Sequence, residues 1–154
     1  MKMLEAFSYY LVSDRIEPDL CGSAAGGESG AVVLFLGIVR GDAVEGRRVT
    51  AITYHAYELL AEREMRLLVL DVYERWPITN VVIRHRIGPV PVGEIALYVQ
   101  VAAPHRAEAY HASQQIIERI KSEVPIWKQT HYKNGSSDWS PSKDSSKEIS
   151  HAGL

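Results

Sequence analysis

Positively charged side chains stand at the ends of several expected structural elements in this sequence. Arg40 follows an apolar run, the pair His105 and Arg106 opens a helical pattern, and Lys121 and Lys128 come near and just beyond the end of that helix. A helix N-terminus offers unpaired amide donors to a phosphate, arginine can bind it through two parallel hydrogen bonds, and lysine adds a point charge. Several of these cations could therefore bind one anionic ligand.

The spacing of these cations along the expected helix keeps them apart. Lys121 lies sixteen residues after His105, which corresponds to about 24 Å at a helical rise of about 1.5 Å per residue. His105 and Lys121 therefore cannot meet within one helix unless long side chains or a second subunit close the gap. A site that spans two subunits would resolve the separation.

Each cation also has a purely structural interpretation. An arginine that follows a strand is usually a solvated loop residue, and for Arg40 alone we favour that interpretation. Lys121 taken alone would be an ordinary surface lysine. His85 and Arg86 come directly before a Gly-Pro turn and are therefore expected to support the end of a strand.

Common enzyme signatures are absent from the sequence. HExxH, GxSxG, CxxC and GxGxxG do not occur, and no close cluster of carboxylates is present. The single cysteine, Cys21, excludes an internal disulfide and a multi-thiolate zinc site, which favours a reducing cytoplasm. We therefore expect no metal site and no resident cofactor.

The composition is that of one folded domain. The chain has 154 residues, of which 46% are hydrophobic and 23% are charged, and its net charge is −2. This charge does not favour a polybasic nucleic-acid or membrane binder, so any basic site must be local. No apolar run reaches the length of a membrane span, and no export signal is recognised at the N-terminus, so we expect a cytoplasmic protein.

The hydrophobic pattern predicts an α+β fold. The run over residues 31–39 is continuous and β-branched, which fits a strand covered on both faces. A Gly-Pro turn between two later strands makes them antiparallel neighbours. Further strands are predicted over residues 4–12, 49–57, 81–87 and 94–102, and helices over 16–20, 58–76 and 105–123.

The chain divides by composition into two parts. Residues 1–133 are predicted to form a single α+β domain. The segment 134–154 contains seven serines between residues 136 and 150 and few apolar residues, which is typical of a flexible tail.

The sequence resembles a known family, the large catalytic subunits of molybdopterin synthase (MoaE type). The resemblance covers roughly residues 30–132 and is found in GAVVLFLGIVRG, YHAYELLAEREM, RWPITNVVIRHRIGPVPVGE, AAPHRAEAY and IKSEVPIWKQTHY. It implies an α/β-hammerhead-type fold with a mainly antiparallel sheet and two long helices. It also implies a homodimer with one small ubiquitin-like partner at each end, a heterotetramer.

The resemblance further implies a reaction. The small partner ends in Gly-Gly with a thiocarboxylate and donates sulfur twice to cyclic pyranopterin monophosphate, which forms the dithiolene of molybdopterin. Thiocarboxylate and phosphate are both negative, so a site that joins them needs several cations. The resemblance assigns catalytic roles to Lys121 and Lys128, and substrate binding to Phe35, Arg40, His105, Arg106 and Lys143.

Two positions depart from the family pattern. His55 stands in YHAY where relatives commonly have Glu, and Lys143 stands where relatives often have an Arg that reaches the neighbouring subunit. A competing hypothesis is a non-catalytic phosphate- or RNA-binding module that uses the same cations. The two hypotheses differ in whether Lys121 is needed for sulfur transfer.

Overall fold

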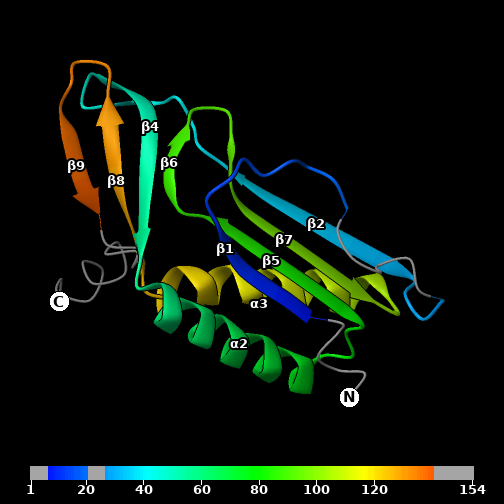
Figure 1. The fold of residues 1–154 in the computed structure, drawn as a ribbon. Helices are drawn as coiled ribbons and strands as arrows, with labels where there is room; N and C mark the ends of the chain where they lie inside the picture. The colour runs from blue at the N-terminus through cyan, green and yellow to red at the C-terminus, as the bar shows by residue number, and fades with distance from the viewer. Residues whose placement is uncertain (1–6, 21–26, 141–154) are drawn as a thin grey trace, which may run out of the picture.

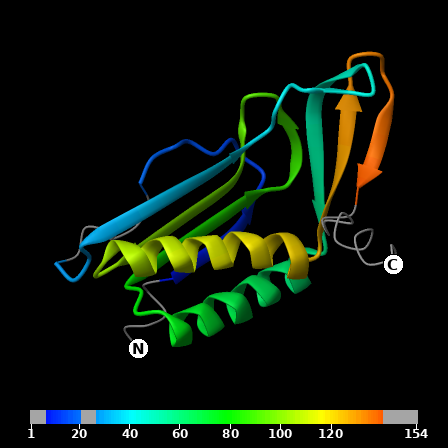
Figure 2. The same cartoon turned by 180° about the vertical axis from the view of Figure 1, so that it is seen from behind.

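The computed structural model describes residues 7–20 and 27–140. Its larger unit is a four-stranded sheet with two helices against one face (Figures 1 and 2). The strand order is β1 (Phe7–Val12), β5 (Asn80–Arg86), β7 (Ile95–Ala103) and β2 (Ala31–Ile38). β1 and β5 are parallel, and the other two pairs are antiparallel. The predicted α+β class and the antiparallel pairing of β5 with β7 are confirmed.

The two helices end where the sequence places prolines. α2 (Glu58–Arg75) is capped at Trp76, directly before Pro77, and α3 (Arg106–Glu123) is capped at Val124, directly before Pro125. Proline disfavours helical backbone in the preceding residue, so both helices stop there. The predicted helices over 58–76 and 105–123 are confirmed to within one residue at each end. Among the described residues, neither helix is long and apolar enough to cross a membrane.

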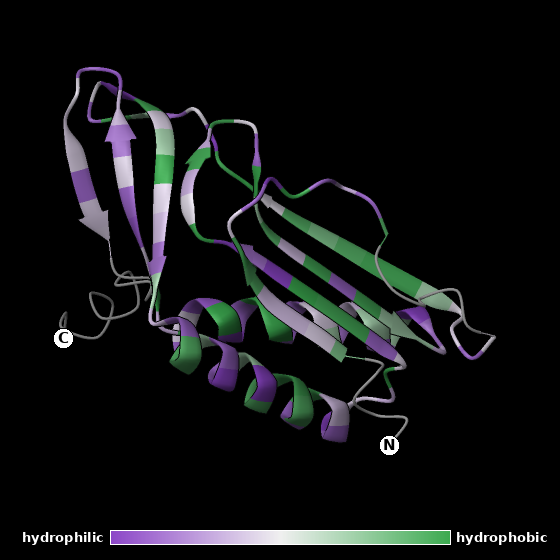
Figure 3. Cartoon of the chain, in the orientation of Figure 1, coloured by the Kyte–Doolittle hydropathy of each residue, from purple (hydrophilic) through white to green (hydrophobic). Residues whose placement is uncertain are grey.

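The main core lies between the sheet and these helices. β7 is buried along its whole length because it has a neighbouring strand on each side and is covered on both faces. Met65 and Val72 of α2 and Ile116 of α3 are fully buried against the same layer as Val99. Figure 3 shows hydrophobic and hydrophilic residues alternating along both helices, as expected for helices with one buried face.

The opposite face of the sheet is covered by an extended segment. A helix was predicted over residues 16–20, and this prediction is wrong: the segment has no helix, and Ile16 is buried against Tyr98. The hydroxyl of Tyr98 lies 2.7 Å from the backbone oxygen of Asp19. Pro18 explains the difference, since it disfavours helical backbone at the residue before it.

A second sheet extends from the end of α3. Its order is β3 (Ala43–Val44), β4 (Arg47–Ala56), β8 (Ile126–Tyr132) and β9 (Ser137–Ser140), with β6 (Gly88–Pro91) also paired to β4. Only β4 among these strands was predicted. The hairpin of β8 and β9 has a recognisable signal, Asn134-Gly135, in which Gly135 has φ 87°. β9 falls within the segment predicted as a tail; residues 141–154 lie outside the described residues, and the division of the chain at residue 133 stays a prediction.

The buried ring of His85 on β5 makes the stability of the fold depend on pH. Its ring is buried beside Tyr54, and its Nδ1 donates to the Arg86 carbonyl oxygen at 2.9 Å. Burial lowers the pKa of His85 from 6.5 to about 4. The unfolded chain therefore binds a proton that the folded chain excludes, and stability falls as the pH drops from about 6.5 towards about 4.

We predict that a change from pH 7 to pH 5 lowers the free energy of unfolding of the wild type by about 2 kcal/mol more than it lowers that of His85→Asn. Urea titrations of both chains at both pH values measure this difference. Other titrating groups are common to both chains and cancel. Equal losses in the two chains would contradict the prediction.

Candidate active site

Arg40 lies in the loop after β2, where the backbone of the residue before it is held and its own head group is exposed. The preceding residue, Val39, is buried and exchanges backbone hydrogen bonds with the β6–β7 turn, from its N–H to Glu94 O at 3.1 Å and from Gly93 N–H to its own oxygen at 2.9 Å. The Arg40 side chain is 83% exposed and forms an ion pair with Asp42 at 3.2 Å. An exposed pair of this kind contributes little stability, so the guanidinium can exchange Asp42 for an anionic ligand.

His105 and Arg106 form the exposed start of α3. His105 is the N-cap residue, with extended backbone and no side-chain capping hydrogen bond. The first amides of the helix are thus not satisfied by that side chain and remain available to an anion beside the Arg106 guanidinium. Glu108 lies in the same first turn, and its Oε2 is buried with no hydrogen-bond partner among the described residues.

Lys121 and Lys128 occupy the other end of the helix and the strand that follows. Lys121 is exposed in the last turn of α3, where a cation interacts favourably with the helix dipole. Lys128 is half-buried in β8 and lies directly opposite Tyr54 of β4. Residues directly opposite across a strand pair share one face of the sheet, so Lys128 and Tyr54 point to the same side. Tyr54 packs against the main core, and burial raises its pKa, so it keeps its proton.

One chain places these cations toward two different ends of the main sheet. β2 and β7 are antiparallel: Ile38 pairs with Ile95 at one end and Ala31 pairs with Ala103 at the other. Arg40 therefore follows the first end, and His105 follows the second. α3 begins just after β7 and runs back along the sheet (Figure 2). Its far end, with Lys121, thus lies toward the Arg40 end, about 22 Å along the helix from Arg106.

The remaining predicted residues lie in or beyond β2. Phe35 is half-buried in the middle of that strand, opposite Val99, and packs against the main core. Lys143 lies outside the described residues.

An aromatic cluster behind Lys128 was not found from the sequence. His55 of β4 stacks on Trp127 with ring centroids 6.0 Å apart and lies 5.1 Å from the Trp139 ring, while Tyr57 lies 5.0 Å from Trp127. These rings join β4, β8 and β9 on the face opposite Lys128. His55, which departs from the family pattern, thus belongs to a cluster of packed rings.

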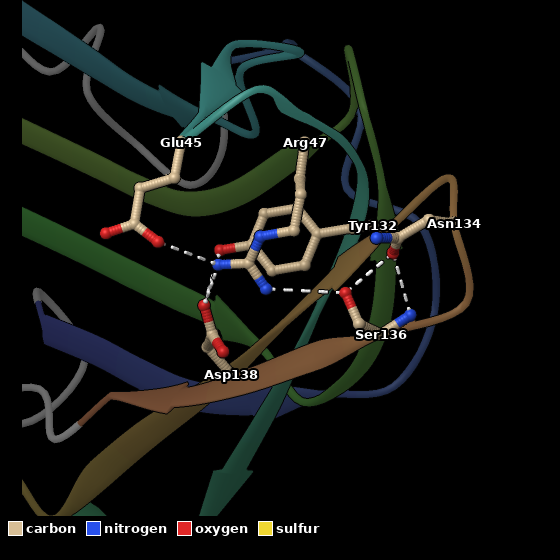
Figure 4. A network of polar contacts seen from close by, with 6 residues as sticks. All are labelled: Glu45, Arg47, Tyr132, Asn134, Ser136 and Asp138. Atoms are coloured by element: carbon tan, nitrogen blue, oxygen red, sulfur yellow. Dashed lines mark hydrogen bonds and ion pairs between the residues drawn. The ribbon is translucent and has the colours of Figure 1, made fainter.

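A polar network fixes the far end of the same sheet (Figure 4). Arg47 donates to Asp138 at 2.8 Å and lies over the Tyr132 ring at 4.0 Å, and Tyr132 donates to the same carboxylate at 2.9 Å. The hydrogen bond from Arg47 and then that from Tyr132 lower the pKa of Asp138. Together with the aromatic cluster, this network orders the hairpin that includes Lys128. The Asn134-Gly135 dipeptide, which is typical of a hairpin turn, is the signal that could have revealed it.

Comparisons with known proteins agree on one family. The family model "MoaE protein" matches residues 11–123. A molybdopterin synthase catalytic subunit from Halalkalibacterium halodurans is 41% identical over 107 residues, 70% of this chain and 68% of that protein. The crystal structure of molybdopterin synthase from Staphylococcus aureus matches with a TM-score of 0.76 and 35% identity over 86% of this chain and 96% of that chain.

A more distant structure shares the fold. The complex of subunits 1 and 2 of molybdopterin-converting factor from Helicobacter pylori matches with a TM-score of 0.63 and 21% identity, over 79% of this chain and 77% of that chain. The comparisons give no support to a phosphate- or RNA-binding module. The resemblance seen in the sequence is confirmed, and the chain belongs to the MoaE family of molybdopterin synthase catalytic subunits.

Proposed function

We propose that this chain transfers sulfur from the C-terminal thiocarboxylate of a small ubiquitin-like carrier to cyclic pyranopterin monophosphate, which forms the dithiolene of molybdopterin. The observation that supports this most is the family match over residues 11–123, which spans Arg40, His105, Arg106 and Lys121. The single cysteine is consistent with sulfur delivered by a partner, and with a reaction in the cytoplasm.

The cations of the proposed site offset the repulsion between the negative thiocarboxylate and the negative phosphate. Two unit charges of the same sign about 4 Å apart repel by about 4 kcal/mol at an effective dielectric constant of about 20. In the proposed site, Arg40, His105 and Arg106 bind the phosphate and pterin, and Lys128 contacts the pterin from its half-buried position beside Tyr54. Lys121 lies beside the thiocarboxylate and stabilises the oxyanion that forms as the carbon–sulfur bond shifts.

The proposed active unit is a homodimer with one carrier at each end. Arg40 and Lys121 lie toward one end of the sheet and His105 toward the other, so a complete set requires residues of two copies. Phe35 and Lys143 are assigned to the same substrate site. The H. pylori protein of the same fold is a complex of two subunits of molybdopterin-converting factor, which supports a small protein partner here.

We predict that Lys121→Ala and Lys128→Ala each reduce dithiolene formation by roughly 10²- to 10³-fold, because each removes a cation that stabilises developing negative charge. The assay combines the chain with thiocarboxylated carrier and cyclic pyranopterin monophosphate. Lys133→Ala is the matched control, since Lys133 is an exposed lysine in the β8–β9 loop. Turnover equal to that of the control in both variants would refute the proposed roles.

Mixed dimers test whether two copies share the site. We predict that Arg106→Ala and Lys121→Ala chains are each inactive alone, and that exchange of their subunits restores about a quarter of wild-type activity, because half of the dimers are mixed and each mixed dimer has one intact site. Native mass spectrometry verifies the exchange. Confirmed mixed dimers without recovered activity would place all these cations in the site of one chain.

A further inference from the structure

We propose that Tyr54 is a specificity-determining residue of the substrate site: its hydroxyl group hydrogen-bonds to the pterin ring that Lys128 contacts. The inference rests on the proposed function, from which it takes the ligand and the contact of Lys128. It adds a neutral hydrogen-bonding group to a site whose other polar residues are basic.

Tyr54 lies in the middle of a row of residues that crosses three strands of the second sheet. It is directly opposite Lys128 of β8 on one side and Gly88 of β6 on the other, and Figure 1 shows β4 between these two strands. Residues directly opposite one another share a face of the sheet, with Cβ atoms about 4.5–5.5 Å apart. A ligand that contacts the Lys128 side chain therefore lies within reach of the Tyr54 side chain.

The Gly88 side of this row is open. Gly88 has φ 92°, a backbone conformation that favours glycine. A Cβ added at Gly88 would have no described atom within 4 Å. The row therefore has no side chain on this side of Tyr54, and space for a planar ring remains next to the hydroxyl.

The ring of Tyr54 is held by the core. It packs against the buried His85 ring in an edge-to-face arrangement, with centroids 4.9 Å apart and planes at 68°. It also packs against the small apolar cluster that includes Val39, the residue before Arg40. Tyr54 thus lies between the strand end that precedes Arg40 and the strand that includes Lys128. A ring that is fixed before a ligand binds loses little entropy in the contact.

The hydroxyl of Tyr54 is available to a ligand. No residue in the described part of the chain hydrogen-bonds to it, and its oxygen is not buried, although the residue as a whole is half-buried. The hydroxyls of the buried residues Tyr98 and Tyr132 have internal partners, the Asp19 carbonyl and the Asp138 carboxylate. Burial raises the pKa of Tyr54, so its hydroxyl keeps the proton that it needs to donate.

A hydroxyl supplies a function that lysine and arginine lack. Their side chains only donate hydrogen bonds, whereas a hydroxyl both donates and accepts. A pterin ring has N–H donors as well as carbonyl and ring-nitrogen acceptors, while a phosphate group offers acceptors. Lysine and arginine alone would leave the donors of the ring unpaired, and an unpaired polar group in a closed site lowers affinity. Tyr54 therefore favours a pterin over a simple phosphate ester.

Tyr54→Phe tests the inference, because it keeps the ring and removes only the hydroxyl. The chain is mixed with a carrier that ends in an ordinary carboxylate, so that no sulfur is transferred, and is titrated with cyclic pyranopterin monophosphate by calorimetry. We expect the dissociation constant to rise about three- to tenfold, the range for one hydrogen bond. Tyr10→Phe is the matched control, since Tyr10 is an exposed tyrosine on β1, and its dissociation constant should equal that of the wild type.

Steady-state kinetics identify the part of the substrate that is contacted. With thiocarboxylated carrier, the KM for cyclic pyranopterin monophosphate should rise by the same factor while kcat and the KM for the carrier stay unchanged, because the contact exists before the chemical step. Inorganic phosphate competes for the cations, and its inhibition constant should be equal in Tyr54→Phe and the wild type. Weaker inhibition by phosphate in Tyr54→Phe would contradict a contact with the ring.

Two further measurements distinguish this contact from a structural role. The free energy of unfolding of Tyr54→Phe in urea should equal that of the wild type, because the hydroxyl has no partner among the described residues. In a Lys128→Ala background, Tyr54→Phe should still weaken binding by about threefold or more. An effect that disappears in this background would show that Tyr54 acts only through Lys128, and would overturn the inference.

The calorimetric titration does not use sulfur transfer, so the two proposals can fail separately. Equal dissociation constants for Tyr54→Phe and the wild type, in a chain that forms the dithiolene, would refute the inference and leave the proposed function intact. A wild type that binds the pterin through the Tyr54 hydroxyl and forms no dithiolene would do the reverse.

Discussion

The rigidity of α3 is the constraint on which the site depends. The helix is one uninterrupted element from Arg106 to Glu123, packed against β2 and β7 through fully buried residues such as Ile116. Its length sets a fixed distance between Arg106 at its start and Lys121 near its end. Side-chain motion cannot close this separation of about 22 Å. A single copy therefore holds the cations at the two ends of α3 apart. The proposed site answers this separation with a second copy, which would supply the group of cations that one chain holds too far away.

The second sheet acts as a stiff support for the remaining lysine. Lys128 lies on the face of β8 that it shares with Tyr54, which packs on the core, while the rings of His55, Trp127 and Trp139 bind the other face. Long lysine side chains lose entropy when they are held, and a strand fixed on both faces limits that loss to the side chain itself. The aromatic cluster and the Arg47–Asp138 pair thus hold the hairpin that includes Lys128.

The sequence allowed the helices, most of the main sheet and the family to be predicted, because periodicity and proline positions act locally. It did not reveal β6 and β8, which pair with β4, a strand distant in the sequence, or β9, which pairs with β8. The helix expected over residues 16–20 failed for a related reason: the burial of Ile16 against Tyr98 is a long-range contact that a local pattern does not contain. Helix spacing alone did predict that His105 and Lys121 stay apart, since that distance follows from one regular element.

The apolar run in β2 allows its sequence pattern to be compared with its burial in the structure. A continuous apolar run is typical of a strand covered on both faces, but β2 is the last strand of its sheet. In the single chain two residues of β2 are exposed and the other six are half-buried, so the expectation that residues 31–39 are covered on both faces is met only in part. The same strand ends one residue before Val39, whose buried backbone holds Arg40 in place. The end of this strand thus places Arg40 through main-chain contacts of its neighbour, while the Arg40 side chain stays exposed.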